Sequence, residues 1–268
     1  MGVTNSQRQY VRALQQRKWR RKYGTFVVEG LTNIKELLNS PLKVIDLYAT
    51  DAALSELSPL LERLGLNAHF GVNARTQSHE LQMHLVGDKE LGRLSSQRSP
   101  HGAVAVAEQP IFDPTRLQAD RVLYLDGISD PGNVGTLMRS AEWFGFECVL
   151  AGEETADFYN PKTVAATRGA LFRVAHGKRA QQVLAEAYPQ HKIIVADLDG
   201  EDLETFEWPS KSILVVGSES LGPSQLLQEA ANAKVTIVPS ASSASESLNV
   251  GVAGSLLMAA AARQSKEG

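Results

Sequence analysis

The second half of the chain is built from short, almost wholly apolar runs that alternate with helix-like segments. The clearest runs are "VLYLDG", "ECVLAG" and "SILVVGSE", and two more are "HKIIVADL" and "KVTIVPS". Strands that are buried on both faces read as continuous apolar runs, because neither side of the strand meets water. The pattern therefore predicts a parallel sheet covered by helices, starting near residue 120.

The first hundred residues show a shorter alternation of the same kind. Three segments read as strands, namely "TFVVEG", "KVIDLYAT" and "HGAVAVAE". Two segments with helical spacing lie between them, "LTNIKELLNS" after the first strand and "LSPLLERLG" after the second. This alternation predicts a small α/β unit.

A proline-containing segment separates the two parts. In "QPIFDPTRLQAD", Pro110 and Pro114 interrupt the pattern, and the strand–helix alternation restarts at Arg121. We therefore expect an N-terminal domain at 1–108, a linker at 109–119 and a second domain at 120–268.

Composition excludes several classes of protein. The 268 residues are 43% hydrophobic and 21% charged, which is ordinary for a globular protein. The single cysteine, Cys148, cannot form an intramolecular disulfide and lies in an apolar run, so we expect a buried core thiol in a reducing compartment. No segment is apolar for long enough to span a membrane, and the start lacks a signal-peptide core. The expectation is a soluble, cytoplasmic protein with no membrane association.

The charge is unevenly distributed. The chain carries a net charge of −3, but residues 1–24, called here the basic arm, contain seven cations and no acid, which leaves −10 on the remaining residues. The seven cations are Arg8, Arg12, Arg17, Lys18, Arg20, Arg21 and Lys22. A basic arm on an acidic body suggests a polyanionic partner, and the alternative is a solvated helix face.

Most standard catalytic motifs are missing. The sequence contains no G-x-G-x-x-G after a strand and no phosphate-binding GKS/T loop. "GSESLG" resembles a nucleophile elbow but has Glu219 where serine is needed. His79 and His84 stand five residues apart with no clustered cysteine or acid, so we expect no metal site.

Three loops instead follow predicted strands. They are "GISDPGNVG", "GSESLG" and "PSASSASESLN". Ligands gather at the carboxyl ends of parallel strands, so these loops are expected to line one site. The alternative is that they are simple turns, with Asp130, Ser245 or Ser247 capping helices.

These loops lie in segments that resemble a known family. "DPGNVGTLMRSAEWFG", "ILVVGSESLG" and "ESLNVGVA" resemble, in order and spacing, the three motifs of the SpoU-type (TrmH-like) RNA ribose 2′-O-methyltransferases of the SPOUT superfamily. "NPKTVAATRGALFRV" is similar to the segment between the first two motifs. The third motif differs in one respect, since "VPSASSASESLN" stands where the family has Ile-Pro-Met and a glycine-containing loop.

The resemblance implies a fold and partners. The expected architecture is a small N-terminal α/β RNA-binding domain, followed by a parallel-sheet α/β catalytic domain with a C-terminal trefoil knot. Its cofactor is S-adenosylmethionine, and the protein is expected to be a homodimer with the active site near the interface.

The resemblance also implies roles for single residues. Asn133 and Arg139 match functional positions of the first motif, Glu219 matches the second, and Ser247 and Asn249 match the third. The expected cofactor-binding residues are Gly217, Val238 and Leu248. Because Arg139 lies within an apolar helix, we expect it to be buried or half-buried and to need an anionic partner such as an RNA phosphate.

The predicted function is transfer of a methyl group from S-adenosylmethionine to a ribose 2′-hydroxyl of RNA, with ribosomal RNA favoured over transfer RNA. Two alternatives stay open. One is a base methyltransferase of the same superfamily, and the other is a non-catalytic RNA-binding protein.

Overall fold

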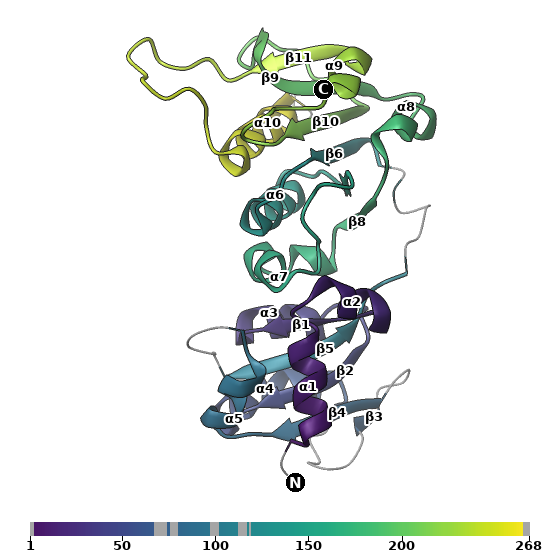
Figure 1. The fold of residues 1–268 in the computed structure, drawn as a ribbon, viewed down its shortest axis with the longest axis vertical. Coiled ribbons are helices and arrows are strands. Elements are labelled where there is room, and N and C mark those ends of the chain that lie inside the picture. The colour runs from purple at the N-terminus through teal and green to yellow at the C-terminus, as the bar shows by residue number, and fades with distance from the viewer. Residues whose placement is uncertain are drawn as a thin grey trace. The chain divides into compact units, whose positions relative to one another are not determined.

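The computed structural model describes residues 3–66, 74–75, 80–96, 102–111, 117 and 119–264. The chain forms two compact units, one from Met1–Ile111 with Tyr159–Phe172, and one from Phe112–Phe158 with Arg173–Gly268. Figure 1 shows the elements of both. His79 and most of the predicted linker lie outside the described residues. The boundaries at 108 and 120 stay a prediction.

The first unit contains a five-stranded mixed sheet in the order β1-β5-β2-β4-β3. β2 and β4 are parallel, and the other neighbouring pairs are antiparallel. Its strands are β1 (Thr25–Glu29), β2 (Val44–Ala49), β3 (Ala74–Arg75), β4 (Glu80–Leu85) and β5 (Ala103–Glu108). Its helices are α1 (Asn5–Ala13), α2 (Arg17–Tyr23), α3 (Leu31–Leu38), α4 (Asp51–Arg63), α5 (Asp88–Leu94), α7 (Pro161–Thr167) and the 3₁₀ turn η2 (Ala170–Phe172).

Alternating side chains of this sheet face two layers. Val27 and Val104 pack with Val11 and Leu91, which come from α1 and α5, and α1 runs across the strands in Figure 1. Phe26 points the other way and contacts the Tyr159 ring at 4.9 Å between centroids. The sheet is therefore covered on both faces.

The basic arm forms two helices, although the pattern of "SQRQYVRALQQRKWRRKYG" predicts a single helix that ends before Gly24. α1 ends at Ala13 and α2 starts at Arg17. The Arg20 guanidinium donates to the carbonyls of Leu14 and Gln15 at 2.8 and 2.9 Å, so it binds the groups that α1 leaves unpaired where it ends. Gly24 ends α2 with φ +64°, as its position predicts.

Two further elements of the first unit were not predicted. β4 and α5 lie in a polar region without a strong apolar pattern. Leu81 and Met83 are nevertheless buried, because β4 pairs along β2 and these two alternate side chains face the core.

The second unit confirms the predicted parallel sheet. Its six strands run in the order β11-β9-β10-β6-β7-β8, and every neighbouring pair is parallel. The strands are β6 (Arg121–Asp126), β7 (Cys148–Ala151), β8 (Ala175–Lys178), β9 (Lys192–Asp202), β10 (Ser212–Gly217) and β11 (Ala233–Thr236). The helical elements are α6 (Pro131–Trp143), η3 (Gln181–Val183), α8 (Leu184–Ala187), α9 (Gln225–Ala230) and α10 (Val250–Gln264).

Helices cover both faces of this sheet. On one face, Tyr124, Leu150 and Val215 form a core with Leu227 of α9. On the other face α10 packs against α6 and β10. Among the described residues, no helix has the length and apolar character needed to cross a membrane.

The apolar run "LFRVAH" predicts a strand at 171–176, and the spacing of "RAQQVLAEAY" predicts a helix at 179–188, but both predictions are wrong. The strand expected at 171–176 begins only at Ala175, because residues 170–172 form a buried 3₁₀ turn. The helix expected at 179–188 reduces to η3 and the four residues of α8. Within residues 179–188 only Leu184 and Tyr188 are buried. Two buried side chains give too little packing to stabilise a long helix.

Candidate functional site

The polar turn after β6 caps α6. The Asp130 carboxylate accepts from the Asn133 backbone N–H at 2.9 Å, and Pro131 occupies the first helical position, where no N–H is needed. The alternative reading of Asp130 as a helix cap is therefore confirmed. The turn also places the Asn133 side chain at the start of α6.

The last motif starts α10 in a similar way. The Asn249 side-chain oxygen accepts from the N–H groups of Gly251 and Val252 at 3.0 and 3.3 Å. Asn249 thus caps the helix, and the alternative that Ser245 or Ser247 does so is wrong. A Cβ on Gly251 would lie 3.4 Å from the Asn133 side-chain oxygen, so the starts of α6 and α10 lie close together.

The loop after β10 is a tight turn. The Gly222 N–H donates to the Ser218 carbonyl at 2.9 Å, and the Leu221 N–H donates to the Ser218 hydroxyl at 3.2 Å. A Cβ on Gly217 would lie 2.0 Å from the Pro223 nitrogen. The missing side chain of Gly217 therefore makes room for the loop's own backbone, and the turn exposes Glu219.

The three motifs meet through hydrogen bonds. The Asn133 Nδ2 group donates to Glu219 Oε1, and Asn249 Nδ2 donates to Asn133 Oδ1 at 3.2 Å. We call this the Asn133–Glu219–Asn249 junction. It joins residues 86 and 116 positions apart, and it brings together three of the five residues expected to be catalytic.

Arg139 lies on the exposed side of α6, contrary to the expectation of a buried or half-buried arginine. Thr136 and Trp143 are exposed on the same helix. Within the described part of the chain, Arg139 has no hydrogen bond or ion pair. Its guanidinium group is therefore available to an anion from solution.

The segment between β11 and α10 contains the other expected residues. Ser247 is exposed and has no hydrogen bond to another described residue. Val238 and Leu248 expose 56% and 47% of their surface. Nothing in the described structure joins Ser247 or Val238 to the junction, while Leu248 is next to Asn249.

A small polar pocket lies elsewhere in the second unit. It has a volume of about 160 Å³, and its lining includes Asp126, Glu153 and Gln181. Asp126 accepts from the Ser224 N–H at 2.7 Å. None of the predicted site residues lines this pocket, and no sequence motif marked it.

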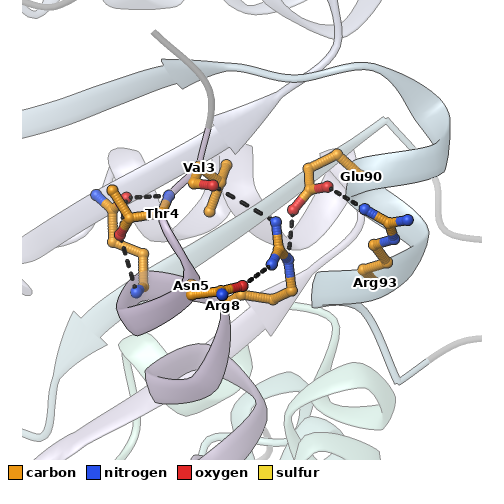
Figure 2. A network of polar contacts seen from close by, with 7 residues as sticks. Val3, Thr4, Asn5, Arg8, Glu90 and Arg93 are labelled. Carbon is orange, nitrogen blue, oxygen red and sulfur yellow. Dashed lines mark hydrogen bonds and ion pairs between the residues drawn. The ribbon is translucent and has the colours of Figure 1, made fainter.

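The basic arm divides into structural and exposed cations. Figure 2 shows Arg8 bound by the Asn5 side chain, the Val3 carbonyl and Glu90, with Glu90 also bound by Arg93. The hydrogen bond from Arg8 lowers the pKa of the Glu90 carboxyl. Arg8 thus fastens α1 to α5.

Arg20 is only 2% exposed, which is incompatible with its expected contact to RNA phosphates. The exposed cations of the arm are Arg12, Arg17, Lys18, Arg21 and Lys22.

Other reactive groups have structural surroundings. Cys148 is fully buried, as predicted, and burial raises its pKa to about 12. His84 contacts the Asp46 carboxylate at 2.9 Å. In the described ranges, no group of three or more His, Cys, Asp or Glu residues is arranged to hold a metal ion.

Comparison with protein families gives two matches. Residues 120–259 match the SpoU rRNA Methylase family, and residues 5–105 match the MRM3-like substrate binding domain. Together they span both units.

Individual proteins match over nearly the whole chain. The chain is 27% identical to the 23S rRNA (guanosine(2553)-2′-O)-methyltransferase RlmP of Bacillus subtilis over 248 residues, covering 91% of each. An RNA methyltransferase of the TrmH family from Porphyromonas gingivalis superposes with a TM-score of 0.82 at 30% identity, over 98% of this chain and 100% of that one. The SpoU methyltransferase AviRb of Streptomyces viridochromogenes, in complex with AdoMet, superposes with a TM-score of 0.81 at 25% identity, over 99% and 100%.

Proposed function

Because the chain belongs to the SpoU rRNA Methylase family, we propose that it transfers a methyl group from S-adenosylmethionine to a ribose 2′-hydroxyl of ribosomal RNA. The observation that carries this function is the Asn133–Glu219–Asn249 junction, since it brings one residue of each motif into one hydrogen-bonded group. Two similar proteins support this substrate class. RlmP is named as a 2′-O-methyltransferase of 23S rRNA, and AviRb is named as a SpoU methyltransferase.

The loops beside the junction suit the cofactor. Leu221, Val238 and Leu248 expose 86%, 56% and 47% of their surface, which is apolar area that an adenine ring would cover. When bound, S-adenosylmethionine supplies a methyl group activated by a sulfonium. In this proposal Val238, Leu248 and the backbone that follows Gly217 hold it.

Arg139 positions the RNA. An exposed guanidinium can bind a phosphate through two parallel N–H groups, which orients the neighbouring ribose. It is a poor base, because a guanidinium gives up its proton only at very high pH. Stabilising the negative charge that develops on the 2′-oxygen is the easier role for it.

The junction residues orient the hydroxyl. Asn133 uses its amide nitrogen on Glu219 and its oxygen on Asn249, so its side chain has one orientation. Glu219 keeps its second oxygen without a hydrogen bond to another described residue, and that oxygen can accept from the ribose hydroxyl. In the same proposal Ser247 contacts the RNA substrate and not the cofactor.

We assign the dimer interface to α6 and α10. Trp143, Val252 and Leu256 are 83%, 49% and 43% exposed on these two helices, and large apolar side chains in contact with water favour a partner surface. A second copy of the chain fits the homodimer that the family implies. Arg139 lies on α6 as well, so the interface would border the catalytic site.

The remaining family features complete the proposal. They are a trefoil knot in the C-terminal part, domains at 1–108 and 120–268 joined by 109–119, and action in the cytoplasm on ribosomal RNA.

A methylation assay tests this function against its alternatives. The full chain, labelled S-adenosylmethionine and 23S rRNA fragments should give a 2′-O-methylated nucleotide. The same RNA with hydrogen in place of the target 2′-hydroxyl should then accept nothing. Continued transfer to the deoxy substrate would identify a base methyltransferase.

Calorimetry with S-adenosylmethionine distinguishes the enzyme from the second alternative, a non-catalytic RNA-binding protein. Binding of S-adenosylmethionine to the protein alone is expected. A protein that binds RNA but takes up no cofactor would be a non-catalytic RNA-binding protein.

A further inference from the structure

Helix α2 carries cations that no acid offsets. Arg17, Lys18, Arg21 and Lys22 are exposed, and none forms an ion pair or hydrogen bond with another described residue. Residues 3–28 contain no Asp or Glu. Four like charges within six residues repel one another, and a polyanion would remove that repulsion.

Two other lysines of the same unit are paired with acids. Lys35 binds Glu56 at 2.7 Å, and Lys43 binds Glu108 at 2.5 Å. Helix α2 differs from these two positions, because it gathers four exposed cations within six residues and contains no acid of its own.

Two aromatic rings stand among these cations. Trp19 and Tyr23 are four residues apart on α2, and their rings stack with centroids 5.7 Å apart and planes within 13°. Tyr23 is 44% exposed, although it also contacts the edge-packed ring of Tyr10. We call Trp19 and Tyr23 the aromatic pair. A stacked pair that leaves ring surface exposed can take a further ring.

The lysines lie against the same rings. Lys22 Nζ lies 5.0 Å from the Trp19 centroid and 5.7 Å from the Tyr23 centroid, and Lys18 Nζ lies 5.3 Å from Trp19. Lysine stems are flexible, so these ammonium groups can turn to a phosphate beside a stacked base.

The surroundings hold the aromatic pair in place. The buried Arg20 binds the carbonyls of Leu14 and Gln15, which fixes α2 against the end of α1. The Tyr10 hydroxyl is hydrogen-bonded to Thr25 at 2.8 Å. Since the rings are ordered before any ligand arrives, little entropy is lost on binding.

We propose that α2 binds an unpaired segment of the RNA substrate, with one base stacked on the aromatic pair and adjacent phosphates bound by Arg17, Lys18, Arg21 and Lys22. This inference rests on the proposed function in taking RNA as the substrate. Bases in a duplex are already stacked on their neighbours, whereas an unpaired base has a free face. The site therefore distinguishes loops and single strands from helices.

The test measures binding of the full chain to a short single-stranded RNA and to the duplex of the same sequence over a series of salt concentrations. Trp19→Ala and Tyr23→Ala should each weaken single-strand binding about 5- to 100-fold, with an unchanged salt slope. Trp19→Phe should keep most of the affinity.

The cations are tested through the salt dependence of binding. Lys18→Gln and Lys22→Gln should each reduce the slope of log affinity against log salt concentration by about 0.7. Lys35→Gln, which removes a paired lysine from the same unit, is the matched control and should change neither quantity.

Two results would overturn the inference. One is a Trp19→Ala protein that is folded by circular dichroism and binds single strands like the wild type. The other is wild-type protein that binds the duplex as tightly as the single strand. Methyl transfer to 23S rRNA is assayed in parallel, so that failure of the aromatic binding site can be told apart from failure of the proposed methyltransferase function. An active enzyme with normal Trp19→Ala binding refutes only the aromatic site, and Trp19-dependent binding without transfer refutes only the enzyme.

Discussion

Arg20 and Arg139 serve opposite purposes at the scale of single residues. The Arg20 guanidinium is buried, and two carbonyls at the end of α1 accept its hydrogen bonds. Arg139 is exposed on α6 without a partner among the described residues. A buried arginine whose donors are bound contributes to folding, while an exposed, unpaired one on the same helix as Asn133 is available to substrate.

Arg139→Ala should leave S-adenosylmethionine binding within a few-fold but lower methyl transfer by roughly two to four orders of magnitude, because one preorganised electrostatic group is lost. Arg139→Lys should restore little, since an ammonium cannot make the planar two-point contact. Calorimetry and single-turnover methylation measure the two effects. Near-normal turnover of Arg139→Lys would show that a point charge is enough.

Asn133→Asp should impair the junction. The substitution replaces the amide group that donates to Glu219 with a carboxylate oxygen, so two negative groups would face each other. We expect methyl transfer to fall about 10- to 100-fold, in line with loss of a hydrogen bond to a charged group, and to recover partly at lower pH as one carboxyl is protonated.

Asn160→Asp is the matched control for that change. Asn160 caps α7 by accepting from the Lys162 N–H at 2.9 Å, and aspartate caps equally well. Its methylation rate should equal that of the wild type. An equal loss in both variants would mean that the Asn133 effect is not specific to the junction.

Cys148 should be chemically inert in the folded protein. Burial raises the pKa of its thiol to about 12, so almost no thiolate exists near neutral pH. Iodoacetamide at pH 8 should label it only after unfolding, as measured by mass spectrometry. Rapid labelling of native protein would contradict the buried position.

At the scale of elements, α6 and α10 pack closely because of small residues. A Cβ on Gly254 would lie 2.4 Å from the Leu137 side chain and 3.5 Å from that of Val216. The hydroxyls of Ser140 and Ser255 hydrogen-bond between the helices at 2.7 Å. This close packing sets the two helix starts where Asn133 and Asn249 can meet.

Gly254→Ala should therefore destabilise the second unit. The added methyl must displace the buried Leu137 side chain, and such overpacking costs about 1 to 3 kcal/mol. Gly92→Ala is the control, because its Cβ would meet no atom within 4 Å in α5 and should stabilise by about 0.5 to 1 kcal/mol. Urea unfolding measures both. A Gly254→Ala protein as stable as the wild type would show that Leu137 can make room for the methyl group and that close packing at Gly254 is not required.

At the scale of the whole molecule, the proposed homodimer makes a further prediction. Wild-type protein should sediment as a dimer, and Leu256→Glu should give a folded monomer, because a charge would replace exposed apolar surface on α10. Leu198→Glu changes a residue that is 73% exposed on β9 and should leave the dimer intact. Sedimentation velocity distinguishes these states, and a monomeric wild type would reject the assignment.

The sequence by itself determined the class of fold and the motifs. Continuous apolar runs predicted the parallel sheet, because burial on both faces leaves no polar position in a strand. The order of the three motifs indicated the family, and the apolar neighbours of Cys148 predicted its burial. Periodicity failed where packing decides, as in β4, which lies in a polar region, and in α8, where little apolar surface is buried.

Only the tertiary structure decided which polar groups meet. Arg139 was expected to be buried or half-buried because its helix is apolar, and Arg20 was expected to meet a polyanion because its segment is basic. Both expectations were wrong. Local sequence shows where apolar residues recur along a helix, but not which distant groups its polar side chains will meet. The hydrogen-bond partners of Asn133 lie 86 and 116 residues away, and only the packing of α10 beside α6 and β10 brings them within bonding distance.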